Sequence, residues 1–295
     1  GNKVRQMEFY LGEALRQSAD TILITGAVQS NFVRVAAAGA RRLGMDCHIQ
    51  LEDRVASDDP VYRNGGNVLL DRILGATLHR YPQGEDEEGA DRNLGAIARQ
   101  LETEGRRPFV IPLAPGHPPL GALGYVVAAG EIVQQIDDGD LCIDEIVVPS
   151  GSGHTHGGLL FGLRVLGCPA AVTGVCVRRD AAAQRDRIAA RCREIGALLG
   201  VPSPVTDADI HVTDAFLSPG YGRLNEATVQ AMATAAHCEG LILDPVYSGR
   251  TMAGFLQRAA GGGDRALLFV HTGGTPGIFA YGPQLTAALA GERSP

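Results

Sequence analysis

The sequence predicts an α/β protein built on parallel sheets. Short apolar runs rich in β-branched residues, such as residues 21–25 and 145–149, alternate with longer segments of helical apolar spacing, such as residues 32–43. A glycine-rich turn joins the run at 145–149 to the helical pattern that follows it. Strand–helix–strand order favours right-handed crossovers and therefore parallel strands. We expect two αβ domains with a cleft between them.

The first half of the chain alternates between the two patterns without interruption. Helical spacing predicts helices at 4–18, 32–43, 67–74, 94–104 and 121–135, and apolar runs predict strands at 21–25, 47–51, 77–81 and 108–113. Residues 113–120 are rich in proline and glycine, which fixes an irregular path, so we place a crossing between domains there. The predicted smaller domain is residues 5–115, and residues 1–4 with 116–295 form the larger one.

The second half continues with further αβ units. The elements expected there are strands at 145–149, 172–177, 211–215, 241–244 and 266–271, and a helix over residues 159–166. In doubly wound sheets, ligands collect beyond the carboxyl ends of the strands. Polar clusters follow four of the predicted strands, which is better explained by a shared ligand than by four separate helix caps. These clusters are Gln29–Asn31, 154–156, 244–249 and 271–277.

Composition excludes several classes of function. A net charge of −7 without a basic cluster argues against nucleic acid as a partner. No apolar run is long enough to cross a bilayer, and no signal peptide is present. The six cysteines form no close pair or Cys/His ligand set, so we expect no metal and interpret them as reduced, buried thiols of a cytoplasmic protein.

The loop at residues 150–158, Ser-Gly-Ser-Gly-His-Thr-His-Gly-Gly, has the composition of an anion site. Glycines let backbone N–H groups approach an anion closely, and the following helix adds its unpaired first-turn N–H groups and its dipole. The loop lacks both the P-loop ending and the dinucleotide fingerprint. A phosphate cradle together with a Ser-Asn turn and a glycine-flanked Lys3 suggests pyridoxal phosphate, which needs a phosphate cup, a Schiff-base lysine and a partner for its pyridine nitrogen.

Several spaced motifs carry a family resemblance. They are Gly1-Asn2-Lys3 followed by Arg and Glu, Gln29-Ser30-Asn31, residues 155–158 (Thr-His-Gly-Gly), Tyr221-Gly222 with Asn225-Glu226, residues 244–247 (Asp-Pro-Val-Tyr) and residues 271–274 (His-Thr-Gly-Gly). Together they resemble the D-cysteine desulfhydrase and 1-aminocyclopropane-1-carboxylate deaminase family, whose members are fold type II pyridoxal phosphate enzymes. The resemblance implies a tryptophan synthase β-like fold and a homodimer. It also implies about fifty residues before the lysine motif, so we expect this sequence to lack an amino-terminal portion of the larger domain.

The resemblance also implies roles for individual residues. Lys3 would be the Schiff-base lysine, Asn31 the partner of the cofactor's ring oxygen, and Ser152, Gly153, His154 and Thr155 the phosphate cup. Ser248 would face the pyridine nitrogen. Ser30 would hold the substrate's carboxylate, and Tyr221 and Tyr247 would line the substrate side of the ring. Beyond what the resemblance implies, we expect the small amino-acid substrate also to contact Gln29, Asn31, His117, His154, Tyr221 and Thr272.

The sequence leaves the reaction open among related eliminations. A serine at 248 cannot keep the pyridine nitrogen charged as a glutamate would, which disfavours opening of a cyclopropane ring. Residues 113–125 most resemble the L-cysteate sulfo-lyase branch, and His117, His154 and Arg34 could supply donors to a sulfonate. We therefore expect conversion of L-cysteate to pyruvate, sulfite and ammonia, with D-cysteine desulfhydrase as the alternative. Aminocyclopropane carboxylate deaminase and an inactive small-molecule-binding homologue are the further alternatives.

Overall fold

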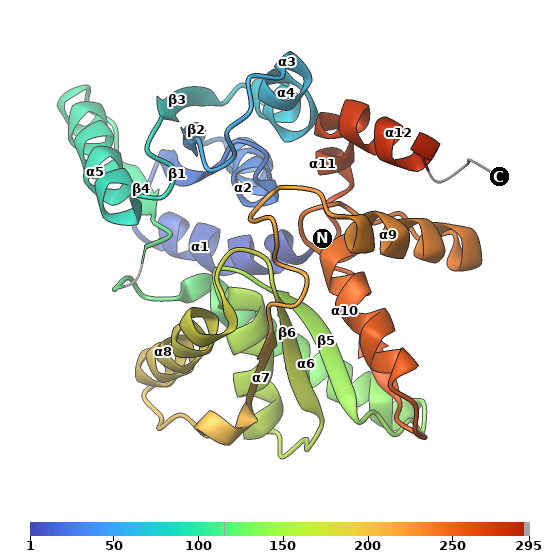
Figure 1. Ribbon diagram of the computed structural model, residues 1–295. Helices are drawn as coiled ribbons and strands as arrows, with labels where there is room; N and C mark the ends of the chain where they lie inside the picture. Colours follow the sequence, from blue (N-terminus) through green and yellow to red (C-terminus); the bar gives the residue numbers. More distant parts are fainter. Residues whose placement is uncertain (115, 292–295) are drawn as a thin grey trace. The chain divides into compact units, whose positions relative to one another are not determined.

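The computed structural model describes residues 1–114 and 116–291, which divide into two compact units. Unit 1 comprises residues 1–6, 118–275 and the chain from residue 283 onward, and unit 2 comprises residues 7–117 and 276–282. Helix α1 (Asn2–Arg16) begins in unit 1 and continues into unit 2 (Figure 1). Pro115, in the predicted crossing between domains, and residues 292–295, the end of the predicted larger domain, lie outside the described residues.

Unit 2 is built on a four-stranded parallel sheet in the order β3-β2-β1-β4. Its central strand β1 is buried along its whole length, because helices cover both faces of a parallel sheet. The strands are β1 (Thr21–Ala27), β2 (Asp46–Glu52), β3 (Thr77–Tyr81) and β4 (Pro108–Ile111). The helices are α2 (Asn31–Arg42), α3 (Pro60–Asn64), α4 (Gly66–Ile73), α5 (Glu87–Thr103) and most of α11 (Thr275–Ala280).

Unit 1 holds a second four-stranded parallel sheet, in the order β7-β6-β5-β8. Its strands are β5 (Glu145–Ser150), β6 (Ala171–Cys176), β7 (Ile210–Thr213) and β8 (Leu267–Phe269). Its helices are α6 (Leu120–Asp138), α7 (His154–Val165), α8 (Ala181–Leu199), the short η1 (Asp207–Asp209), α9 (Glu226–Glu239), α10 (Ser248–Ala260) and most of α12 (Gly282–Gly291).

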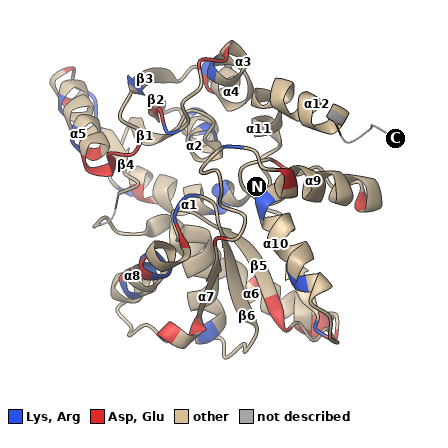
Figure 2. Ribbon diagram, in the orientation of Figure 1, with Lys and Arg blue, Asp and Glu red and all other residues tan. Residues whose placement is uncertain are grey.

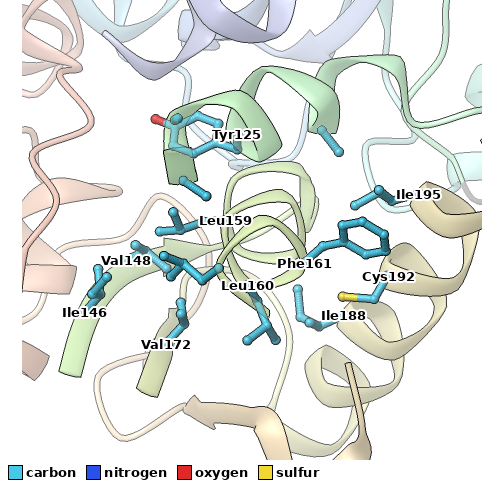
Figure 3. Packing of buried hydrophobic residues seen from close by; sticks show 14 of the residues in the cluster. Tyr125, Ile146, Val148, Leu159, Leu160, Phe161, Val172, Ile188, Cys192 and Ile195 are labelled. Carbon is cyan, nitrogen blue, oxygen red and sulfur yellow. The ribbon is translucent and has the colours of Figure 1, made fainter. Parts of the chain in front are cut away.

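The core of unit 1 forms where α6, α7 and α8 meet β5 and β6 (Figure 3). Leu159, Leu160 and Phe161 of α7 are fully buried, and this helix is buried on nearly every side from His154 to Leu163. Gly158 and Gly162 let α7 approach α6 closely, since a Cβ at either position would meet α6 backbone atoms at 2.3 and 2.8 Å. This packing fixes the helix that follows the glycine-rich loop.

The predicted fold class is confirmed: the chain has two parallel-sheet αβ units. Basic and acidic residues both occur along α5 and α8 (Figure 2). Within residues 1–114 and 116–291, no helix combines the length and the apolar character needed to span a bilayer.

Two expectations were wrong. Residues 241–244 are not a strand, because β8 occupies the edge of the sheet beside β5 and these residues pair with no strand. Leu243 instead packs with α9 and α10 in a separate apolar cluster. The cysteines are all free, as expected, but Cys142 and Cys238 are exposed.

Candidate active site

Lys3 lies in the first turn of α1 and is the single lysine of the 295-residue sequence. Burial of its amine lowers the pKa of Lys3 from 10.5 to about 8, because removal from water disfavours the charged form. A much larger fraction of the amine is therefore neutral near physiological pH than for an exposed lysine, and only a neutral amine can attack a carbonyl carbon. The absence of any other lysine is a sequence signal that points to Lys3 more strongly than its flanking residues do.

Two hydrogen bonds connect the start of α1 to the start of α7, and a third joins Lys3 to this network. Lys3 Nζ donates to Gln6 Oε1 at 3.5 Å, and Gln6 Nε2 donates to Thr155 Oγ1 at 3.0 Å. Asn2 Nδ2 donates to the same Thr155 oxygen at 2.9 Å. The structure therefore brings Lys3 together with the predicted phosphate cup.

The glycine-rich loop ends at a helix start that has no side-chain cap. Gly153 is the N-cap of α7 and adopts a φ of 91°, a left-handed conformation that suits glycine. By contrast, α8 and α9 are capped by the side chains of Asp180 and Asn225. The first-turn N–H groups of α7 thus have no side-chain acceptor at the cap, which is the arrangement that an anion completes.

Arginines surround this loop on the side of α8. Arg179 Nη1 donates to the carbonyl of Gly151 at 3.3 Å, and Arg187 Nε donates to that of Ser152 at 3.3 Å. Arg191 is buried and acts electrostatically on His154. These cations favour an anion at the loop, in line with the helix dipole.

His154 is held neutral. Burial lowers its pKa well below 6.5, and the charges of Arg191, Lys3 and Arg187 lower it further. A neutral imidazole can donate one hydrogen bond but supplies no positive charge. His154 can therefore offer a sulfonate one hydrogen bond but no positive charge, and its expected contact with the substrate remains a prediction.

A buried network supports the loop from beneath. Gln184 Nε2 donates to Ser150 Oγ at 2.8 Å and to the carbonyl of Gly151 at 3.1 Å. Ser150 Oγ lies 3.0 Å from His156 Nδ1, and burial lowers the pKa of His156 to about 4. Ser150 Oγ accepts from Gln184 and shares a second hydrogen bond with the neutral His156, and the tautomer of the imidazole sets the direction of that second bond.

Tyr221 and Tyr247 come together as predicted neighbours in unit 1. Their phenol oxygens are 2.7 Å apart and their rings meet edge to face. Arg250, fully buried, donates to the carbonyls of Gly220 and Arg223 and so holds the loop that carries Tyr221. Neither Gln6 nor Arg250 was among the residues predicted from the sequence.

Ser248 begins α10 and is engaged with Asp244. Its hydroxyl donates to Asp244 Oδ1 at 2.7 Å and accepts from the Asp244 backbone N–H at 2.8 Å. The turn after β8 lies nearby, because Ser248 Oγ is 3.4 Å from the carbonyl of Gly273. Asn2 N donates to the carbonyl of Thr272 at 3.1 Å, which ties the same turn to the start of α1.

The remaining predicted residues belong to unit 2. Ser30 caps α2, its hydroxyl accepting from Phe32 N and Val33 N. Asn31 Oδ1 accepts from Asn67. His117 Nε2 lies 2.7 Å from Asp91 Oδ2, so a carboxylate already occupies that ring nitrogen.

Gln29 is fully engaged inside unit 2. Its Oε1 accepts from Asn67 N at 2.9 Å, and its Nε2 donates to the carbonyls of Tyr62 and Gly65. These bonds use every polar hydrogen of its amide and join β1 to α3 and α4. The substrate roles predicted for the unit 2 residues remain predictions.

Comparison with known proteins identifies the family. The profile of the family described as "Pyridoxal-phosphate dependent enzyme" matches residues 1–273. This chain belongs to the pyridoxal-phosphate dependent enzyme family. The chain is also similar to D-cysteine desulfhydrase of Salmonella typhi, to which it is 39% identical over 288 residues, covering 97% of this chain and 85% of the relative.

Solved structures agree with the fold. An ACC deaminase homologue has a TM-score of 0.85 and 36% identity, over 98% of this chain and 84% of that one. O-ureido-L-serine synthase, at 18% identity and a TM-score of 0.65 over 95% of this chain and 83% of its own, shares the fold. The fold is thus that of fold type II pyridoxal-phosphate dependent enzymes, as predicted.

Pyridoxal phosphate is the cofactor of this family, and the residues of unit 1 fit it. A buried amine of lowered pKa lies on the same side-chain network as an uncapped helix start, and arginines surround the loop. The chain is a pyridoxal-phosphate dependent lyase. The L-cysteate branch expected from the sequence finds no support among these relatives, which are named D-cysteine desulfhydrases.

Proposed function

We propose that this chain eliminates the sulfur of a small amino acid, with D-cysteine as the substrate and pyruvate, hydrogen sulfide and ammonia as the products. The observation that carries the proposal is the single lysine, with its amine of lowered pKa, hydrogen-bonded through Gln6 to Thr155 at the uncapped start of α7. The identity of 39% to D-cysteine desulfhydrases supports the choice of substrate.

Bound pyridoxal phosphate supplies an electron sink that stabilises negative charge at the substrate's α-carbon. Lys3 provides the base, since its amine is neutral at a pH above about 8 and can take the α-proton. The sulfur then leaves the β-carbon as hydrosulfide. Water completes the balance: one D-cysteine and one water give pyruvate, hydrogen sulfide and ammonia.

Tyr221 and Tyr247 act as a pair in this proposal. With phenol oxygens 2.7 Å apart, the two hydroxyls share one hydrogen bond, and we assign to this pair the delivery of a proton to the substrate. A phenol can protonate a departing sulfur at neutral pH, because the Tyr side chain remains protonated until about pH 10. We assign Ser152, Gly153, His154 and Thr155 to the cofactor's phosphate.

The environment of the expected sulfonate donors favours D-cysteine over L-cysteate. A sulfonate stays anionic and needs several donors when it leaves water, preferably charged ones. His154 is neutral, and His117 is paired with Asp91. Arg34 donates to Asn67 and lies close enough to Asp71 to feel its charge.

The proposal is tested by measuring pyruvate release from D-cysteine, L-cysteine, L-cysteate and aminocyclopropane carboxylate with the purified protein and added pyridoxal phosphate. We expect the highest kcat/KM for D-cysteine. Pyruvate from L-cysteate or the cyclopropane but not from D-cysteine would contradict the substrate. Cofactor binding without pyruvate from any of the four would support the inactive-homologue alternative.

A further inference from the structure

Gln6 lies between Lys3 and Thr155, and the roles assigned to those two residues give no function to Gln6 itself. It lies one helical turn after Lys3, so both side chains are on the same face of α1. Gln6 is fully buried, and a buried glutamine must have partners for its amide. Its two partners in unit 1 are the Lys3 amine and the Thr155 hydroxyl.

The chemistry of these partners fixes which way the Gln6 amide faces. Both the ammonium and the neutral amine can donate, so an amide oxygen facing Lys3 Nζ at 3.5 Å suits either protonation state, whereas an amide N–H would find no acceptor on the ammonium. The amide nitrogen then faces Thr155 Oγ1 as a donor, at 3.0 Å. The orientation of Gln6 is therefore set by Lys3.

Thr155 receives two donors at one oxygen. Gln6 Nε2 and Asn2 Nδ2 lie 3.0 and 2.9 Å from Thr155 Oγ1, and a hydroxyl oxygen has two lone pairs. With both lone pairs used, the hydroxyl can act only as a donor. Among the described residues, no hydrogen bond donated by this hydroxyl is found, and Thr155 stands in the first turn of α7, where an anion is favoured.

We propose that Gln6 is a positioning residue for pyridoxal phosphate, which holds the Lys3 amine and turns the Thr155 hydroxyl into a donor toward the phosphate. This inference rests on the proposed function and deepens it. A neutral amide suits the task, because a carboxylate at this position would favour the ammonium form of Lys3 and repel a phosphate at α7. A side chain without an amide would leave Lys3 and Thr155 unconnected.

Two variants separate these effects. Gln6→Glu keeps the size of the side chain and adds a charge, and Gln6→Met keeps the approximate size and removes both hydrogen bonds. Gln134, exposed on α6 of the same unit, supplies the matched control Gln134→Glu. Melting curves of the proteins without cofactor establish that each variant is folded under the conditions of the measurements.

The single lysine allows a readout that is independent of activity. Lysine labelled with ¹³C at Cε gives one lysine signal from this sequence, so its shift against pH reports the Lys3 pKa in the protein without cofactor. We expect a midpoint near 8 in the wild type and in Gln134→Glu. In Gln6→Glu it rises by at least about one unit, as an opposite charge within hydrogen-bond reach requires; in Gln6→Met it does not rise.

Cofactor affinity gives the second readout. Loss of one hydrogen bond of ordinary strength raises the Kd for pyridoxal phosphate about tenfold in Gln6→Met, and the added charge raises it further in Gln6→Glu. Wild-type affinity and an unchanged Lys3 midpoint in both variants would overturn the role of Gln6 while leaving the proposed function intact. Failure of the wild-type protein itself to bind pyridoxal phosphate would overturn both.

Discussion

The phenol oxygens of Tyr221 and Tyr247 lie 2.7 Å apart, although the two residues are 26 positions apart in the sequence. One hydrogen bond is shared, so removing either hydroxyl disturbs the same proton. The loop of Tyr221 is held by a buried arginine, Arg250, and Tyr247 precedes α10, so both phenols are carried by fixed backbone.

We expect Tyr221→Phe and Tyr247→Phe each to lower kcat for pyruvate formation by about a hundredfold, the usual effect of removing a group that transfers a proton. The double variant should have a kcat no lower than that of the less active single variant, because both substitutions break the same shared hydrogen bond. Steady-state kinetics with D-cysteine measure this. Tyr125→Phe, in the core of unit 1, serves as the control and should retain wild-type kcat. Losses in the two single variants that multiply in the double variant would show that the phenols act separately.

Gly153 should be needed for cofactor binding because of its backbone conformation. At a φ of 91°, an alanine is strained by about 1–2 kcal/mol. In Gly153→Ala the glycine-rich loop therefore shifts away from its left-handed conformation at residue 153. We expect the Kd for pyridoxal phosphate to rise about tenfold.

Gly167 provides the control for that strain. It follows the other end of α7 with a φ of 70°, and a Cβ added there would meet no atom within 4 Å. Gly167→Ala therefore carries a similar backbone strain at the end of α7 away from the loop. We expect a similar loss of stability and an unchanged Kd. Equal effects of both substitutions on the Kd would mean that strain in α7, and not the loop, governs binding.

The sequence predicts the sheets well because apolar periodicity is a local property. The predicted strand at 77–81 coincides with β3, and the other seven observed strands lie within two residues of their predicted bounds. The segment 241–244 has the same apolar character as a strand, but β8 takes the place beside β5. Competition for a sheet edge is decided by the whole chain and cannot be read from one segment.

The residues of the site fall into two groups, those that local motifs predict and those that only the structure reveals. Lys3 and Thr155 come from motifs whose spacing is local, and the structure links them in unit 1. The partners that decide their chemistry are distant in sequence: Thr155 accepts from Gln6 149 positions away. Such partners leave no periodic signal, so Gln6 and Arg250 could be found only from the structure. By contrast, the presence of only one lysine in the sequence already indicates Lys3 as the amine that binds the cofactor.

Asp71 of α4 should make the stability of the protein depend on pH. Burial raises its pKa from 3.8 to about 7, and neither carboxylate oxygen has a hydrogen-bond partner among the described residues. The folded state therefore holds this proton more tightly than the unfolded state. The stability that protonation of Asp71 gives to the folded state is fully present below pH 3.8 and is lost as the pH rises to about 7.

Asp71→Asn keeps the neutral form at every pH. We expect the variant to be more stable than the wild type at pH 8 by at least about 1 kcal/mol and nearly equal at pH 4, in urea unfolding followed by circular dichroism. Asp58→Asn, at an exposed site of the same unit, is the control and should differ little from wild type at either pH. A lower stability of Asp71→Asn at pH 8 would mean that the ionised carboxylate stabilises the fold through Arg34.

The central claim, that Lys3 carries pyridoxal phosphate, is tested most directly by reducing the cofactor-loaded protein with borohydride and locating the phosphopyridoxyl group by peptide mass mapping. The group should be found on Lys3 alone, the visible absorbance should be absent from Lys3→Ala, and the rate of cofactor capture should rise as the pH passes about 8. A phosphopyridoxyl group on any other residue, or a Lys3→Ala variant that retains the absorbance, would contradict the account.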